Sequence, residues 1–222
     1  MSRTRELAAG GRVVEVEPER LAGFLERFAA GHGGVVTTTV APQRVDVVAG
    51  DGWTASIPVP FGSLAGQPRQ LAGLAVDDLV AHLMVPRTIG LLLVRLGGYS
   101  VGIACAGVVL TSSTGSRLVH RRTAAGGQSQ QRFARRREGQ ARLALQAAAD
   151  TAARVLLPRA AELDAVVLGG DTTALRSLAA DPRLTALLAR ADPRVLNIPE
   201  PRRTTLDQAA RRARCVEVHL LP

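Results

Sequence analysis

The sequence contains no lysine, few aromatic residues and only two cysteines. Cys105 and Cys215 stand in apolar, strand-like segments without a second cysteine or a histidine at ligand spacing. We therefore interpret both as buried structural thiols. This shortage of clustered ligands argues against a metal site, and we expect neither a metal ion nor another cofactor.

Long apolar runs are also missing. The longest, residues 89–94, is far too short to cross a bilayer, and residues 1–11 carry charges but no apolar run. These absences exclude an ordinary membrane-spanning helix. We expect a cytoplasmic protein that does not associate with a membrane.

Positive charge dominates the sequence. All 28 basic residues are arginine, and with 19 acidic residues they give a formal net charge of +9. Such a surplus indicates a polyanionic partner, nucleic acid or the ribosome, because guanidinium groups suit bidentate phosphate contacts. The alternative is a merely basic soluble protein whose arginines reflect a genome rich in G and C.

The length of 222 residues allows one large or two small domains, and a hydrophobic content of 46% indicates a folded chain. Periodicity predicts a small mixed unit first. Its expected strands cover residues 12–16, 35–40, 44–49 and 53–59, its helices cover 19–30 and 76–84, and residues 64–73 are expected to form a linker.

The remainder of the chain alternates strands with helices. The expected strands cover residues 89–96, 99–106, 107–111, 117–121, 165–168, 195–198 and 216–221, and the expected helices cover 129–157, 172–180, 184–190 and 205–214. Alternation of this kind favours a sheet covered by helices. The predicted fold class is α/β (mixed α+β), with a small N-terminal α+β unit and linker over residues 1–85 and an α/β domain over 86–222.

The segment from 121 to 142 stands out by its charge. It contains seven arginines and a single acidic residue, Glu138; the arginines are Arg121, Arg122, Arg132, Arg135, Arg136, Arg137 and Arg142. A helix disfavours cations in its first turn because of its dipole, so this cluster points to an external anion. The alternative is a solvated helix face.

A short loop of small residues precedes the long predicted helix. Gly126 and Gly127 allow close approach of the backbone to another surface and accept positive φ angles, and Gln128 and Ser129 follow where the helix should begin. Locally, the same residues also fit a glycine turn with Ser129 as the N-cap.

In this segment the sequence resembles a known family. Gly126-Gly127-Gln128-Ser129, two spacer residues, Arg132-Phe133-Ala134-Arg135 and Arg137 are similar to the glycine-glycine-glutamine loop and following helix of eukaryotic and archaeal class-1 peptide release factors. Val166-Val167-Leu168-Gly169-Gly170 and Asp181-Pro182-Arg183-Leu184 are similar to segments downstream of that loop. The resemblance covers roughly residues 89–222.

The sequence also departs from those factors. No segment resembles their domain that decodes stop codons or the domain that recruits a partner GTPase. The chain is therefore more similar to the single-domain, release-factor-like branch used in ribosome quality control, which includes bacterial peptidyl-tRNA hydrolases. Its eukaryotic members cut the tRNA near its 3′ end. In that branch the critical glutamine can follow a Gly-Ser pair, so Gln130 is an alternative to the favoured Gln128.

The resemblance implies a peptidyl-tRNA hydrolase acting on stalled large ribosomal subunits without regard to stop codons, in ribosome rescue. It assigns catalysis to Gly126, Gly127 and Gln128, with Gln130 as the alternative glutamine. Contacts with RNA are assigned to Arg121, Arg122, Arg132, Arg135, Arg136 and Arg137. The implied partners are the large ribosomal subunit, the 3′ end of peptidyl-tRNA and ribosomal RNA, with the chain as a monomer. A tRNA nuclease and a non-catalytic ribosome-binding or tRNA-binding module remain the alternatives.

Overall fold

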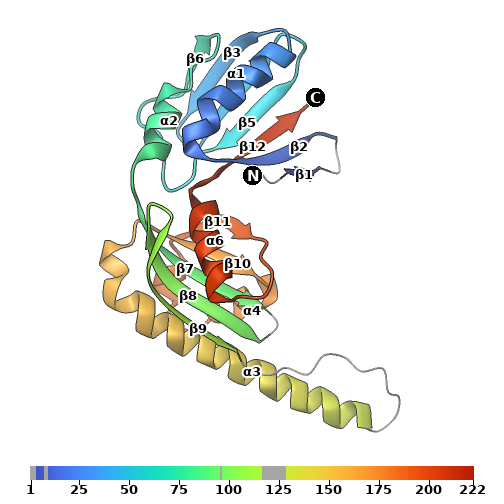
Figure 1. Ribbon diagram of the computed structural model, residues 1–222, viewed down its shortest axis with the longest axis vertical. Coiled ribbons are helices and arrows are strands. Elements are labelled where there is room, and N and C mark those ends of the chain that lie inside the picture. The colour runs from blue at the N-terminus through green and yellow to red at the C-terminus, as the bar shows by residue number, and fades with distance from the viewer. Residues whose placement is uncertain (1–3, 8–9, 96, 117–128) are drawn as a thin grey trace. The chain divides into compact units, whose positions relative to one another are not determined.

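The computed structural model describes residues 4–7, 10–95, 97–116 and 129–222, with side chains at the start of the long helix described only from residue 139 onward. The described chain divides into two compact units. The first comprises Met1–Pro86 and Arg212–Pro222, and the second comprises Arg87–Arg211. The chain thus leaves the first unit, forms the second and returns to the first (Figure 1).

Within its described residues, the first unit contains a seven-stranded antiparallel sheet in the order β1-β2-β12-β5-β4-β3-β6. The strands are β1 (Thr4–Glu6), β2 (Arg12–Val16), β3 (Val35–Ala41), β4 (Arg44–Ala49), β5 (Thr54–Pro58), β6 (Arg69–Ala72) and β12 (Val216–Leu221). The helices are η1 (Pro18–Arg20), α1 (Leu21–Gly31) and α2 (Asp77–Met84).

Alternation along these strands buries one face of the first sheet. Val45 and Val47 of β4 and Ile57 of β5 are fully buried with Leu21 and Leu25 of α1. The intervening residues are less buried, as expected for an antiparallel sheet with one solvated face. The core of the first unit therefore lies between this sheet and its helices.

Strand β12 occupies an interior position in that sheet. It pairs antiparallel with β2 on one side, where Glu217 lies opposite Glu15, and with β5 on the other, where His219 lies opposite Ser56. The division expected from the sequence had placed this strand with the second unit. Arg212 adds an ion pair to the first unit, donating from Nη2 to Glu15 Oε1 at 2.5 Å.

Among the described residues, the second unit is built on a five-stranded sheet in the order β11-β10-β7-β8-β9. Its strands are β7 (Thr88–Arg95), β8 (Gly98–Cys105), β9 (Val108–Ser116), β10 (Ala165–Gly170) and β11 (Ala191–Leu196). Strand β10 runs parallel to β7 and β11, whereas β7, β8 and β9 form an antiparallel meander. Its helices are α3 (Ser129–Leu156), η2 (Leu157–Glu162), α4 (Thr172–Ala179), α5 (Thr185–Leu188) and α6 (Arg203–Arg214), whose last residues belong to the first unit.

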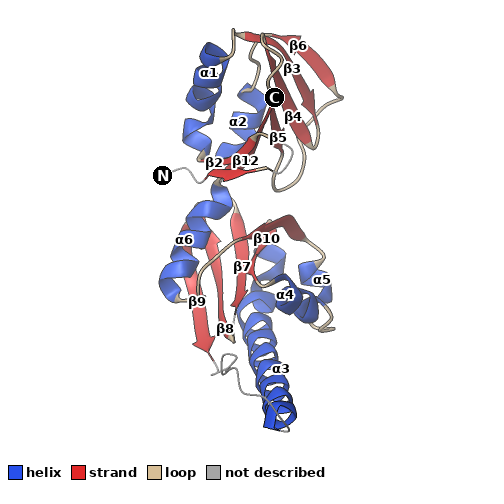
Figure 2. Cartoon of the chain, turned by 90° about the vertical axis from the view of Figure 1, so that its right-hand side faces the viewer, coloured by secondary structure: helices blue, strands red, loops and turns tan. Residues whose placement is uncertain are grey.

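Helices cover both faces of the second sheet. Figure 2 shows α6 on one face and α3, α4 and α5 on the other. Two glycines permit this close approach: a Cβ on Gly102 would lie 2.8 Å from Leu206 of α6, and one on Gly90 would lie 3.3 Å from Leu156 of α3. The predicted mixed α+β class is confirmed.

Three local predictions differ from the structure. Residues 69–72 form edge strand β6 inside the expected linker, held by pairing with β3. Strand β9 continues to Ser116 instead of ending at residue 111. Strand β11 covers Ala191–Leu196 instead of 195–198, and its proline is tolerated because β11 is an edge strand of the described sheet. The strand expected at 117–121 lies outside the described residues.

Candidate functional site

The loop singled out by the sequence connects β9 to α3. Residues 117–128 lie outside the described part of the chain, and they include Arg121, Arg122, Gly126, Gly127 and Gln128. What the structure does place are the two elements that carry this loop, because β9 ends at Ser116 and α3 begins at Ser129.

The other predicted site residues lie in the first turns of α3. These are Gln130, Arg132, Arg135, Arg136 and Arg137. Their backbone is helical, while their side chains are outside the description. The first turn contains no acidic residue, so no carboxylate there offsets the arginines that follow.

The C-terminal half of α3 packs the helix against the sheet. Ala148, Ala152 and Leu156 are fully buried and pack with Val101 and Ile103 of β8. Alanine combines the highest helix propensity with a small side chain, so the helix axis can lie close to the strands. This half of α3 is a fixed base for the loop at its other end.

Beyond this base, α3 continues past the sheet. The described residues before Ala144, from Gly139 to Leu143, are partly or fully exposed, and Leu143 is 53% exposed. Figures 1 and 2 both show the N-terminal part of α3 extending beyond the ends of the strands. The predicted loop is therefore attached to the tip of a projecting helix.

Polar contacts also join α3 to the strands beneath it. Arg154 Nη2 donates to Ser113 Oγ of β9 at 3.0 Å, and Thr151 Oγ1 lies 3.4 Å from Tyr99 Oη of β8. Gly115 makes room for that tyrosine, since a Cβ at this position would lie 2.4 Å from Tyr99 Oη. These contacts hold one face of α3 against strands β8 and β9.

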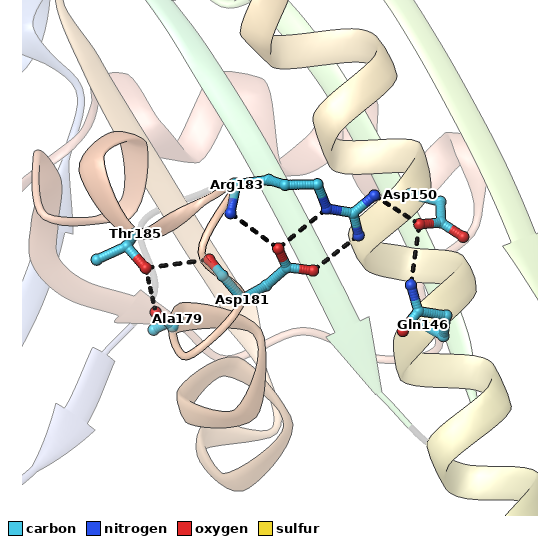
Figure 3. Close-up of polar contacts among 6 residues, drawn as sticks. All are labelled: Gln146, Asp150, Ala179, Asp181, Arg183 and Thr185. Atoms are coloured by element: carbon cyan, nitrogen blue, oxygen red, sulfur yellow. Dashed lines mark hydrogen bonds and ion pairs between the residues drawn. The ribbon is translucent and has the colours of Figure 1, made fainter.

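A cluster of polar groups contacts α3 from the connection between α4 and α5 (Figure 3). Arg183 Nη1 donates to Asp150 Oδ1 of α3 at 2.9 Å. The same guanidinium donates from Nε to Asp181 Oδ1 at 3.0 Å and from Nη2 to Asp181 Oδ2 at 2.7 Å. Gln146 Nε2 also donates to Asp150 Oδ1, at 3.0 Å. One arginine thus joins two carboxylates that lie far apart in the sequence.

The connection that carries Arg183 is itself well ordered by hydrogen bonds. The backbone N–H of Arg183 donates to Asp181 Oδ1 at 3.0 Å, and Thr185 Oγ1 donates to the Asp181 carbonyl at 3.0 Å. The pKa of Asp181 is lowered, mainly by the hydrogen bond from the Arg183 side chain and further by the Arg183 backbone N–H. Asp181 therefore remains ionised and paired with Arg183 at neutral pH.

The glycine pair at the end of β10 has a steric explanation. Gly170 has φ +107°, and a Cβ there would lie 2.0 Å from the Val94 carbonyl oxygen. A Cβ on Gly169 would lie 2.7 Å from Leu93 Cδ2. Part of the Val166–Gly170 motif thus allows β10 to pair closely with its neighbouring strand β7.

A protein-family model matches residues 87–219, and its family is described as "Actinobacteria/chloroflexi VLRF1 release factor". The matched region is more than half of the chain and contains the loop, α3 and Arg183. The chain belongs to this family. The predicted release-factor-like assignment is thereby confirmed, and membership of the VLRF1 release factor family supports a release-factor-type role at the ribosome.

Other comparisons add little to this assignment. No curated protein matches the chain. Among solved structures, an archaeal translation termination factor, aRF1, aligns with 12% identity and a TM-score of 0.44, covering 89% of this chain and 70% of that one. A second structure, described as an archaeal protein, aligns with 11% identity and a TM-score of 0.36, covering 87% and 69% respectively.

The described residues of this release factor family member contain no group of three or more His, Cys, Asp or Glu side chains that could hold a metal ion. Two of the three described histidines have close polar partners: His32 Nδ1 lies 2.8 Å from Asp51 Oδ2, and His82 Nε2 lies 2.9 Å from the Pro60 carbonyl. His120 lies outside the description. No helix in the described ranges is long and apolar enough to cross a membrane.

Sequence reasoning did not single out Asp150. It found the motif that contains Arg183, but helical periodicity alone gives no sign that an exposed aspartate on α3 is the partner of that arginine. The one available signal was the acidic residue itself, in a helix whose first half is strongly basic.

Proposed function

We propose that this chain hydrolyses the ester bond between a nascent peptide and its tRNA on stalled large ribosomal subunits, independently of stop codons. The observation that carries the proposal is the match to a release factor family over residues 87–219, a region with Gly126-Gly127-Gln128 immediately before α3. A loop at the tip of a projecting helix suits a substrate recessed within RNA. We further propose that the chain acts in the cytoplasm as a monomer.

The chemistry of ester hydrolysis requires an oriented water, stabilisation of negative charge on oxygen and exclusion of other nucleophiles. In our proposal the backbone N–H of Gln128 donates to the developing oxyanion or to the departing ribose oxygen. The Gln128 side chain places the water, and Gly126 and Gly127 let the backbone approach the tRNA end. The tRNA ribose and ribosomal RNA complete the site, so a side-chain base is not required.

The arginines around the loop serve binding in this proposal. Six of them would contact RNA phosphates: Arg121, Arg122, Arg132, Arg135, Arg136 and Arg137. Phosphate contacts release counterions, so each lost contact should flatten the dependence of ribosome affinity on salt. Replacing Arg132, Arg135 and Arg136 together with alanine should weaken binding to large subunits and reduce that salt dependence while the fold is retained.

Product analysis tests the proposed reaction. Purified protein is mixed with large subunits that carry peptidyl-tRNA with a labelled peptide, and the products are separated. Free peptide with intact tRNA is expected. A peptide still bearing a nucleotide fragment would instead identify a tRNA nuclease, and absence of any product would identify a non-catalytic binding module; either outcome would overturn the proposal.

Variants of the two glutamines identify the active position in the same assay. Because proline removes the backbone N–H, Gln128→Pro should be inactive, whereas Gln128→Ala retains the donor and should be only reduced. Gln130→Ala is the matched control and should remain close to wild type. An inactive Gln130→Ala with a fully active Gln128→Ala would move the site to Gln130.

A further inference from the structure

Helix α3 is held from two sides, and the second side has no role in the chemistry proposed above. Ala148 and Ala152 face the sheet, and Asp150, two residues from each, lies on the opposite side of the helix because each residue turns it by about 100°. There Asp150 accepts the hydrogen bond from Arg183 at 2.9 Å (Figure 3).

The geometry around Arg183 favours a fixed donor over a flexible surface side chain. Two nitrogens of Arg183, Nε and Nη2, donate to Asp181 and fix the plane of the guanidinium. The third nitrogen, Nη1, is thereby directed toward Asp150. Gln146 orients the acceptor by donating to the same Asp150 oxygen. Both partners in the contact between α3 and the α4–α5 connection are therefore preorganised.

Stability alone does not explain this arrangement. The Arg183 and Asp150 side chains are 43% and 55% exposed, and ion pairs with such exposure contribute little to the free energy of folding. The orientation of α3, in contrast, has large consequences at its tip. Ser129 is about 30 Å from Asp150 along the helix, so a tilt of about 10°, within the usual scatter of packing angles, moves the tip by about 5 Å.

We propose that Arg183 is a positioning residue, which holds α3 through Asp150 so that the Gly-Gly-Gln loop reaches the peptidyl-tRNA ester in the correct place. This inference rests on the proposed hydrolase function. A misplacement of even about 1 Å at a reacting centre can reduce a rate by about a hundredfold. Loss of the Asp150 contact therefore lowers the rate of the chemical step more than the affinity for the ribosome.

The kinetic test uses Asp150→Ala in single-turnover peptide release from large subunits. We expect the maximum rate at saturating protein to fall by about a hundredfold, while the half-saturating concentration changes by less than about twofold. Asp150→Asn, which keeps an acceptor oxygen, should recover part of the rate. Glu162→Ala is the matched control, because Glu162 is 56% exposed and binds Arg159 within η2 without joining two elements.

A structural test reads the position of α3 directly. Spin labels are attached at Gly139→Cys, where a side chain meets open space, and at Arg176→Cys on α4, in a chain carrying Cys105→Ser and Cys215→Ala. Asp150→Ala should widen the distribution of label distances by about 3 Å, since position 139 is about 16 Å from Asp150.

The two readouts separate the failure of each proposal. If the wild-type chain releases no peptide, the proposed function fails and the label distances alone decide the role of Arg183. An unchanged distance distribution in Asp150→Ala overturns the positioning role. So does a release rate in Asp150→Ala equal to that of Glu162→Ala. A melting curve that shows Asp150→Ala partly unfolded at the assay temperature, to an extent that accounts for the lost rate, also overturns it.

Discussion

Leu156 is the last residue of α3, and truncating it should destabilise the second unit strongly. Its side chain is fully buried and faces Gly90 of β7, which has no side chain that could fill the resulting cavity. Leucine-to-alanine changes at buried sites cost about 2–5 kcal/mol, and the poor ability of this site to collapse places Leu156→Ala at about 3 kcal/mol. The adjacent Leu157 is 37% exposed, so Leu157→Ala provides a matched control with a cost below about 1 kcal/mol.

The expected shift in melting temperature follows from the size of the unit. With about 125 residues between Arg87 and Arg211, the unfolding entropy is about 0.26 kcal/mol/K, so 3 kcal/mol corresponds to about 12 °C. Trp53 is the sole tryptophan and lies in the first unit, so its fluorescence reports that unit, whereas circular dichroism reports both. Leu156→Ala should lower the melting temperature of the second unit, which is detected by circular dichroism, and leave the melting temperature detected by Trp53 fluorescence unchanged. Equal shifts in melting temperature for Leu156→Ala and Leu157→Ala would refute the conclusion that Leu156 packs the end of α3 against the sheet.

Three further predictions address the loop, an ion pair and pH. Gly127→Ala should abolish peptide release with less than about 1 °C change in melting temperature; retained release would remove the loop from the mechanism. Glu15→Ala should cost the first unit about 2–3 kcal/mol, measured by tryptophan fluorescence in urea, because Arg212 loses a largely buried partner; a change below about 0.5 kcal/mol would contradict this. The hydrogen bond from His32 lowers the pKa of Asp51 below its ordinary value of 3.8. The ionised Asp51 carboxylate therefore contributes its full stabilisation above pH 3.8, and this stabilisation is lost as the pH falls through the lowered pKa. Asp51→Asn should accordingly make the first unit less sensitive to pH between about 5 and 3, and an unchanged pH profile would count against it.

Local patterns in the sequence were sufficient for much of the secondary structure. The bounds of β2, β4 and β12 match the predicted ranges, and α3 begins at Ser129 as expected. Strands β4 and β12 alternate buried with less buried residues, and α3 has a clear helix start, so local preference and tertiary packing agree in these segments. The presence of a release-factor-like region was likewise readable, because Gly-Gly-Gln is followed by Arg-Phe-Ala-Arg without a gap.

The features that sequence reasoning missed depend on contacts between distant segments. Strand β6 has the weakly apolar sequence Arg-Gln-Leu-Ala, and only pairing with β3 makes it a strand. The pairing of β12 with β2 joins segments at opposite ends of the described chain, which no local pattern can reveal. The bond from Arg183 to Asp150 spans 33 positions and depends on how α4 packs beside α3. Local propensity contains no information on any of these pairings.

The interior position of β12 has a consequence for the order in which the chain folds during synthesis. Translation produces β2 and β5 early, yet the strand that lies between them is produced only after the whole second unit. The unit that is synthesised second can thus complete its sheet first, against the usual N-to-C order. Until β12 arrives, the facing edges of β2 and β5 remain available for wrong pairing, so a chain interrupted shortly before residue 216 should be prone to aggregation.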